Sequence, residues 1–310
     1  MKQKFLILFA APAACLFFFT SCKKNSTPRC GDGKTTVTTT KVIATGLNDP
    51  RGLKFGPDGN LYVAEAGTGG KTVCSTCLQV LPPIGPYFGS NTGARISKID
   101  RNGVRTTVAD NIPSSTTQPT GGSGIQGVAD VEFIGNTLYA VTGGSGSSHS
   151  VPDVPNGIIK VNKDGTWKLV ANCSEFLMTH PVSTIDSSDY EPDGTPYSMT
   201  SVGGDLYITE PNQQEIDRIN PLTGKISRVV DISILHPFIE GQWLGPTSMV
   251  YHNGNFYFGT LTSFPTVTGA AKVYKLDENG NYSVYASGLT AVLGIAFDSE
   301  GRLYVMEDFG

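Results

Sequence analysis

GLKFGPDGNLYVAE, residues 52–65, is the stretch that decides the fold. It consists of a short apolar strand, a tight turn that contains Gly59, and an alternating apolar–aromatic strand, which is the pattern of a β-hairpin. The same pattern returns at residues 131–142, 198–210, 249–260 and 294–307. Repeats of a sheet-forming unit indicate small sheets arranged around an axis. The sequence therefore predicts an all-β protein, a β-propeller.

Second strand pairs of equal regularity follow the first four hairpins, at residues 94–110, 157–171, 214–231 and 272–286. Two hairpins make one four-stranded blade, whose strands run from the axis to the rim. The fifth hairpin lacks such a pair, so we expect five visible blade units in an open ring with a truncated C-terminus. A ring of five imperfect blades is the alternative. Residues 36–47 resemble the outermost strand at 282–289, and we expect them to seal the last blade.

Loop lengths separate the two faces of the predicted propeller. Within each hairpin the turn is tight, and all these turns lie on one face, because antiparallel strands alternate their ends. The connections on the opposite face are long, at about residues 66–93, 110–126, 143–156, 172–196 and 261–270. Long loops in a compact domain usually carry function, so we expect a ligand or partner on this long-loop face.

Charge excludes one class of partner. The formal net charge is −4 and the pI is near 5.6. Nucleic-acid binding needs basic surface that displaces counterions, so we expect no nucleic-acid partner. We expect the propeller to be a monomer.

The first residues have the features of a targeting segment. Lys2 and Lys4 precede an apolar run at residues 5–19, which is too short to anchor stably across a bilayer. The run closes on Phe19-Thr20-Ser21-Cys22, which resembles a bacterial lipobox. We therefore predict a signal peptide at 1–21, an acylated Cys22, a polar tether at 22–34 and a propeller domain at 35–310. The protein would then be an exported outer-membrane or periplasmic lipoprotein that touches the membrane only through its lipid; a plain secretory signal is the alternative.

Four cysteines remain outside this segment and are candidates for disulfides in an oxidising compartment: Cys30, Cys74, Cys77 and Cys173. Cys74 and Cys77 form a CxxC motif, but no second CxxC and no thioredoxin-like pattern accompany it. A disulfide that clamps a loop is the favoured interpretation, and a redox-active pair or a metal site is the alternative.

Several blade segments resemble the ScyD/ScyE family of exported propellers. The resemblance rests on TPYSM and GPTSM, on the LTSFP loop, and on YASGLT, LYVME and LYVAEAG, at residues 195–199, 245–249, 261–265, 285–290, 303–307 and 61–67. It departs where Ser263 replaces a glycine, in the insert at 71–92, and where a further C-terminal blade should follow. The resemblance implies a six-bladed propeller, named from a sunscreen-pigment biosynthesis cluster, with no settled reaction.

A more distant similarity to the gluconolactonase, strictosidine synthase and streptogramin lyase (NHL-like) propellers implies a cation or a charged pocket at the axis. The position that ends the second strand of each blade is the matching place here. It carries hard oxygen ligands of the kind that Ca²⁺ prefers, in the order Glu65, Thr142, Glu210, Thr260 and Glu307. The three glutamates are the candidate metal ligands. The alternative is that these side chains accept backbone N–H bonds at the strand ends.

Other candidates lie on adjoining loops of the long-loop face. Arg51, Asp130 and Asn212 could act as ligand-binding or acid–base groups. Trp243, with Tyr197 and Phe264 nearby, could line a pocket, and packing between blades is the alternative for these aromatic residues.

Two functions stay open. One is a binding module for a small molecule, a glycan or a protein on the long-loop face. The other is a metal-dependent hydrolase or lyase, for which calcium is the one cofactor suggested. Convergence of the three glutamates would favour the enzyme, and glutamates that point into their own blades would favour binding.

Overall fold

The computed structural model describes residues 41–80, 82, 84–120, 123–185, 191–234, 243–262 and 265–308. Residues 42–310 form one compact unit. The predicted signal peptide and tether, with Cys22 and Cys30, lie outside the described residues, as does Phe264. In the part of the chain that is described, no helix is long and apolar enough to span a membrane.

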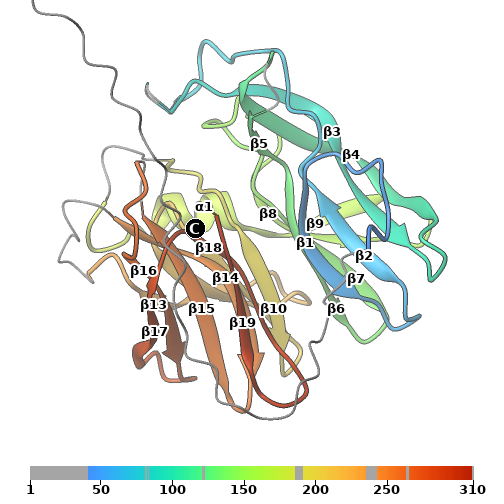
Figure 1. The fold of residues 1–310 in the computed structure, drawn as a ribbon. Helices are drawn as coiled ribbons and strands as arrows, with labels where there is room; N and C mark the ends of the chain where they lie inside the picture. The colour runs from blue at the N-terminus through green and yellow to red at the C-terminus, as the bar shows by residue number, and fades with distance from the viewer. Residues whose placement is uncertain are drawn as a thin grey trace, which may run out of the picture. The chain divides into compact units, whose positions relative to one another are not determined.

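The described chain folds into antiparallel sheets of consecutive strands, each of which we call a blade (Figure 1). Blade 1 contains β1 (Pro50–Phe55), β2 (Leu61–Glu65), β3 (Phe88–Ile99), β4 (Arg105–Gln118) and β5 (Ser123–Gln126). Blade 2 contains β6 (Val128–Ile134), β7 (Thr137–Thr142), β8 (Gly157–Val161) and β9 (Trp167–Asn172). Blade 3 contains β10 (Ser198–Val202), β11 (Asp205–Glu210), β12 (Glu215–Ile219) and β13 (Ile226–Asp231).

Blade 4 contains β14 (Leu244–His252), β15 (Asn255–Thr262), β16 (Ala271–Leu276) and β17 (Tyr282–Leu289). Blade 5 is the hairpin of β18 (Val292–Phe297) and β19 (Leu303–Glu307). One helix, α1 (Cys173–Thr179), interrupts the sheets within the described residues. The predicted all-β propeller is confirmed, with four strands in blades 2, 3 and 4 and a fifth strand in blade 1.

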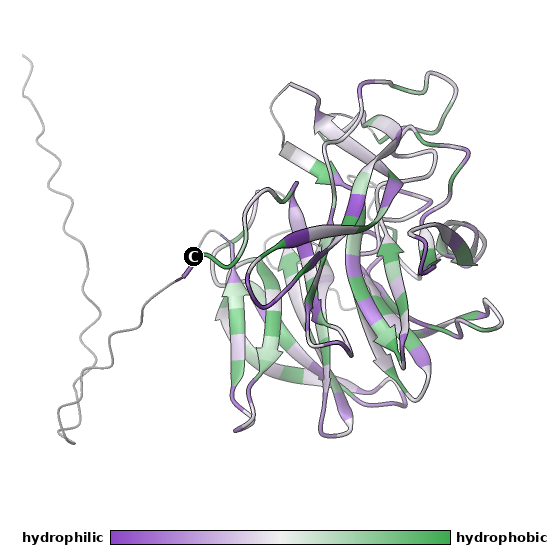
Figure 2. Cartoon of the chain, turned by 90° about the vertical axis from the view of Figure 1, so that its right-hand side faces the viewer, coloured by the Kyte–Doolittle hydropathy of each residue, from purple (hydrophilic) through white to green (hydrophobic). Residues whose placement is uncertain are grey.

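Apolar side chains pack between neighbouring blades, because each sheet has two faces to bury. Ile96 and Ile159 join blades 1 and 2, Ile158 and Leu206 join blades 2 and 3, and further apolar side chains, Phe256 among them, join blades 3 and 4. In Figure 2 hydrophobic residues concentrate in the strands, and polar residues concentrate in the turns and loops. The inner strands contact one another in the order β1, β6, β10, β14 and β18.

A β-bulge recurs near the start of the inner strands, where the long loops lead into the blades. The pairing shifts between Pro50 and Leu53, and the inner strands of blades 2, 4 and 5 shift at the matching place. A bulge bends the strand and re-aims the side chains around it. Arg51 and Asp130 lie at these bulges.

We predicted that residues 36–47 form a strand that seals the last blade. For the part of this segment that the structure describes the prediction is wrong, because residues 41–47 form no strand. A Cβ added to Gly103 would nevertheless touch the carbonyl oxygen of Ile43. The matching turn glycines of blades 2, 3 and 4 approach carbonyls of the preceding blade's outermost strand, at Val108, Val170 and Val229. Ile43 therefore occupies the place of an outermost strand. No strand among the described residues lies inside Ile43 to pair with it.

Candidate functional site

The side chains that end the second strands do not gather around one ion. No group of three His, Cys, Asp or Glu residues that could hold a metal occurs within the described part of the chain. Glu65 and Glu210 are fully buried, whereas Glu307 is exposed. The structure therefore does not bring these three glutamates together, and each accepts hydrogen bonds from its own blade or from the loop that precedes it.

Glu65 shows how such a carboxylate is used. Arg95 donates to both oxygens at 2.9 and 2.7 Å, and Ser97 and the backbone N–H of Asn48 also donate to it. Burial by itself would raise the pKa of Glu65, but the hydrogen bonds from Arg95 and Ser97 lower it below the usual value. Glu65 is thus an ionised carboxylate whose acceptor positions are occupied.

The equivalent residues of the other blades also satisfy local groups. Glu210 accepts from the backbone N–H of Thr195 at 2.6 Å and from that of Gln213, and burial raises its pKa to about 8. Glu307 accepts from a backbone N–H. The hydroxyls of Thr142 and Thr260 bond to the backbone of the adjacent third strand. This arrangement corresponds to the alternative interpretation, in which the strand ends are tied to their own blades.

Charged and aromatic groups do come together where the bulged inner strands meet the long-loop face. We call them the axial cluster, which consists of Asp49, Arg51, Asp130, Tyr197 and Asp308. Arg51 donates to Asp49 at 3.2 Å and to the backbone carbonyl of Ile125, and its side chain keeps 26% exposure.

Tyr197 links this cluster across the inner strands. Its hydroxyl donates to the carbonyl oxygen of Leu293 at 3.4 Å, which connects blade 3 to blade 5. Burial raises the pKa of Tyr197, the Arg51 charge lowers it, and the nearby carboxylates of Asp49, Asp130 and Asp308 raise it. These interactions place the phenol among charges from blades 1, 2 and 5.

Asp130 lies in the wall between three blades. It accepts from the Ser198 hydroxyl at 3.1 Å and from the backbone N–H groups of Met199 and Val131 at 2.8 Å each. A Cβ at Gly52 of blade 1 would collide with its carboxylate, which explains why that position is glycine. Although the residue keeps some exposure, protein surrounds its carboxyl group, and this burial raises the pKa to about 7.

The remaining predicted residues lie elsewhere. The Asn212 side chain accepts from the backbone N–H of Glu191 at 2.8 Å and so helps to hold a loop. Trp243 is half-buried immediately before β14.

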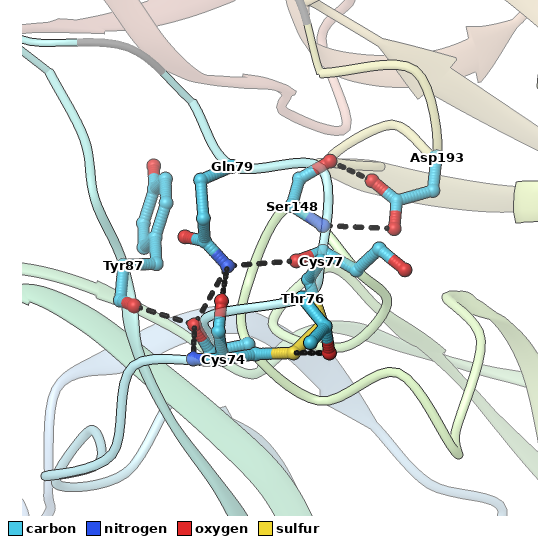
Figure 3. The surroundings of a disulfide bond; sticks show 9 residues. Cys74, Thr76, Cys77, Gln79, Tyr87, Ser148 and Asp193 are labelled. Atoms are coloured by element: carbon cyan, nitrogen blue, oxygen red, sulfur yellow. Dashed lines mark hydrogen bonds between the residues drawn. A yellow bond between two sulfur atoms is a disulfide. The ribbon is translucent and has the colours of Figure 1, made fainter.

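A buried polar network under the long loops was missed in the sequence. Ser148 donates to Asp193 from its hydroxyl and, at 3.1 Å, from its backbone N–H (Figure 3). His149 is fully buried, its Nε2 lies 3.6 Å from Glu191, and its ring packs at 4.4 Å on Tyr87. Burial lowers the pKa of His149 to about 4, so it is neutral. These contacts join three long loops, and no motif in the sequence marks the residues that make them.

The CxxC motif lies on the same face, in the connection between β2 and β3 (Figure 3). Cys74 and Cys77 form the predicted disulfide. The Cys74 N–H donates to the Ser150 hydroxyl at 3.0 Å, and Gln79 donates to the Ser147 carbonyl at 3.1 Å, which fixes this loop to its neighbour.

Cys173 is not part of a disulfide. Its thiol is free and buried at the start of α1, and burial raises its pKa. The prediction of a disulfide at Cys173 is therefore wrong, because the side chain packs in the apolar core between blades 2 and 3.

No protein-family model matches the chain, and no curated protein matches it. Among solved structures, it is similar to a gluconolactonase from Xanthomonas campestris, with 11% identity over 86% of this chain and 72% of the other, at a TM-score of 0.49. It is also similar to a putative 6-phosphogluconolactonase from Bacteroides uniformis, with 13% identity over 85% and 66% of the two chains, at a TM-score of 0.45. Likeness at this level does not extend to activity, and the ScyD/ScyE resemblance stays a prediction.

Proposed function

We propose that this protein is an exported, lipid-anchored β-propeller that binds a small molecule on its long-loop face. The axial cluster carries the proposal. Arg51, Asp130 and Tyr197 come from the inner strands of three different blades or their immediate starts, and the charges of Arg51 and Asp130 both act on the Tyr197 phenol. No single hairpin needs this combination for its own folding, whereas ligand sites commonly combine a few polar groups with an aromatic ring.

The groups present indicate the kind of ligand. Asp49 and the Ile125 carbonyl hold the Arg51 guanidinium in one orientation while part of its side chain remains exposed. A guanidinium fixed in this way presents donors in a defined plane. The Asp130 carboxyl, with a pKa of about 7, both donates and accepts near neutral pH. We infer that the ligand is a small polar molecule that carries several hydroxyl groups.

Binding is tested by thermal shift with a panel of sugars, aldonic acids and sugar lactones. At least one compound should raise the melting temperature of the wild type and fail to raise that of Arg51→Ala. Arg101→Ala is the matched control, because Arg101 is an exposed arginine in the tight turn between β3 and β4. Tyr197→Phe serves as a milder second variant. A compound that stabilises Arg51→Ala and Tyr197→Phe as strongly as wild type would show that the axial cluster is not the binding site.

The anchor is tested separately, because it rests on the sequence alone. The basic Lys2 and Lys4, the apolar run at 5–19 and the Ser21-Cys22 pair support acylation of Cys22. Cys22→Ser should release the protein from the membrane fraction, whereas Cys30→Ser should not. Membrane association that survives Cys22→Ser would contradict the anchor.

A hydrolase or lyase is the second candidate, and Asp130 is the observation that favours it. A carboxyl group with a pKa near 7 is suited to move protons at neutral pH. An enzyme of this kind would depend on Asp130 for proton transfer and not on a glutamate-bound metal. Turnover of a lactone by the wild type that is lost in Asp130→Asn, with binding retained, would support an enzymatic function. No turnover of any compound in the panel would contradict it.

A further inference from the structure

A row of three side chains recurs on the same face of the four complete blades. A tyrosine on the second strand lies opposite a basic residue on the third, which lies opposite a residue on the fourth. The rows are Tyr62, Lys98 and Thr106; Tyr139, Lys160 and Lys168; Tyr207, Arg218 and Ser227; and Tyr257, Lys275 and Ser283. The fourth strand thus supplies a hydroxyl residue in three blades and a second lysine in blade 2.

Acidic residues neutralise the row in two of the other blades. Asp58 lies 3.8 Å from the Lys98 ammonium, and Asp205 accepts from Arg218 at 2.7 Å. Asp205 is the first residue of the second strand in blade 3, and the matching residue of blade 2 is Thr137. Blade 2 therefore adds a cation to the row and lacks the acid of blade 3.

The two lysines of blade 2 have no counter-charge among the described residues. No ion pair there involves either of them. The next residue of this row toward the axis is Glu132, which lies opposite Tyr139. The Glu132 carboxylate already forms an ion pair with Lys54, at 2.6 Å between Nζ and Oε2. Like charges directly opposite each other in a sheet destabilise it. The pair Lys160 and Lys168 thus favours the presence of an anion.

These lysines line a groove of about 310 Å³ between blades 2 and 3. Its far wall is the turn between β12 and β13, which contributes Leu222 and the Thr223 side chain. None of the residues that line the groove is acidic. Leu222 is 88% exposed and Leu169 is 36% exposed, so apolar surface adjoins the two ammonium groups.

We propose that this groove binds an acidic saccharide. The lysines supply charge for a carboxylate, and the leucines offer apolar surface to the C–H faces of a sugar ring. The volume lies at the lower end of the range for ligand sites, so it suits one or two rings. The groove lies at the rim and is distinct from the axial cluster.

Calorimetric titration of the mature full chain with digalacturonate tests the proposal, with cellobiose as the neutral disaccharide and inorganic phosphate as a small anion. Digalacturonate should bind at low salt and weaken at high salt, because the contact is ionic. Any binding of cellobiose should be unchanged by Lys168→Ser, because a neutral disaccharide has no charge for the lysines, and phosphate should bind at least about tenfold more weakly than digalacturonate. Cellobiose binding that Lys168→Ser weakens as much as digalacturonate binding, or phosphate as tight as digalacturonate, would overturn an acidic saccharide as the ligand.

Two variants restore features of the other blades. Lys168→Ser installs the residue found in blades 3 and 4, and Thr137→Asp installs the acid of blade 3 while leaving both lysines in place. Each should weaken digalacturonate binding about threefold to fivefold. Lys275→Ser in blade 4 is the matched control and should bind like wild type, because Lys275 occupies the same place of the row in a blade without the second lysine. Thr137→Asp with unchanged affinity would contradict the charge argument.

Discussion

Blades 1 and 3 carry a glutamate at the same position of the repeat, in opposite surroundings. Glu65 lies opposite Arg95 across the strand ladder, whereas Glu210 lies opposite Glu215. The first carboxylate is paired, and its pKa is lowered; the second is buried without a cation partner, and its pKa is raised to about 8.

The difference extends one step along the third strand. Ser97 of blade 1 corresponds to Asp217 of blade 3, which lies beside Glu215. Neither Asp217 oxygen receives a hydrogen bond from a donor among the described residues. Burial and the Glu215 charge raise the pKa of Asp217 well above its usual value, so we infer that Asp217 holds a proton and donates it to Glu215. The repeat thus determines the backbone of a blade and leaves its charge state to individual residues.

Removal of the cation from blade 1 should have the largest effect. Arg95→Met keeps an apolar stem and leaves the buried Glu65 charge unpaired, which should cost about 3 kcal/mol in the free energy of unfolding. Arg228→Met is the comparison in blade 3, where Glu215 can accept a proton instead; its cost should be nearer about 1 kcal/mol. Urea denaturation at neutral pH measures both values. Equal losses would mean that the two blades do not differ in charge compensation.

The pH dependence of stability should differ in sign between the two glutamates. The folded pKa of Glu210 is about 8 and its usual value is 4.5, so the folded state holds the extra proton between these values. Stability contributed by Glu210 is therefore lost as the pH rises from 4.5 through 8. Glu210→Gln should remove this loss and gain about 1–2 kcal/mol at pH 8.

Glu65→Gln provides the opposite case. Its folded pKa is lowered, so its contribution is present above its usual pKa of 4.5 and is lost as the pH falls through the folded value. The variant should be destabilised at neutral pH and should approach the wild type in acid. Urea midpoints measured from acid to pH 9 give both profiles. Parallel profiles for the two variants would contradict the comparison.

Asp217→Asn should have a smaller effect at pH 6. The raised pKa of Asp217 favours its protonated form, and an amide can donate to Glu215 as a protonated carboxyl would, so stability should change by less than about 1 kcal/mol. The variant should become the more stable protein as the pH rises, because it has no proton to lose. The same urea titrations provide the measurement, and a variant that loses stability relative to the wild type as the pH rises would contradict the inference.

The sequence predicted the hairpins well because their signals are local. The alternating strands and the turn glycine at Gly59 lie within about a dozen residues of each other. The ends of two strands in blade 1 were harder to predict. β3 begins at Phe88 and β4 runs to Gln118, so both extend into stretches that we expected to be loops. These extensions depend on pairing with one another and with β5, which local propensity does not report.

The candidate site was predictable only in part, for a related reason. Arg51 and Asp130 were selected for their place near the strand starts, and the structure brings them together with Tyr197. The two glutamates at the strand ends are indistinguishable locally, since the residue that decides their charge state lies opposite them on the third strand, 30 positions away in blade 1 and five in blade 3. His149 and Asp193 carry no motif, because their contacts join loops distant in sequence.

The smallest expected effect is that of calcium. A cation that bound the folded state at a hundredfold excess over its Kd would add about 2.7 kcal/mol, a shift of a few degrees in melting temperature. Both Glu65 oxygens already accept hydrogen bonds, and Glu210 accepts backbone N–H groups on both of its own. Calcium would have to displace these donors in separate blades at once. Neither calcium nor a chelator should therefore shift the melting temperature, by calorimetry, of wild type or Glu210→Gln. A chelator effect that disappears in Glu210→Gln would show that the two blades share a cation after all.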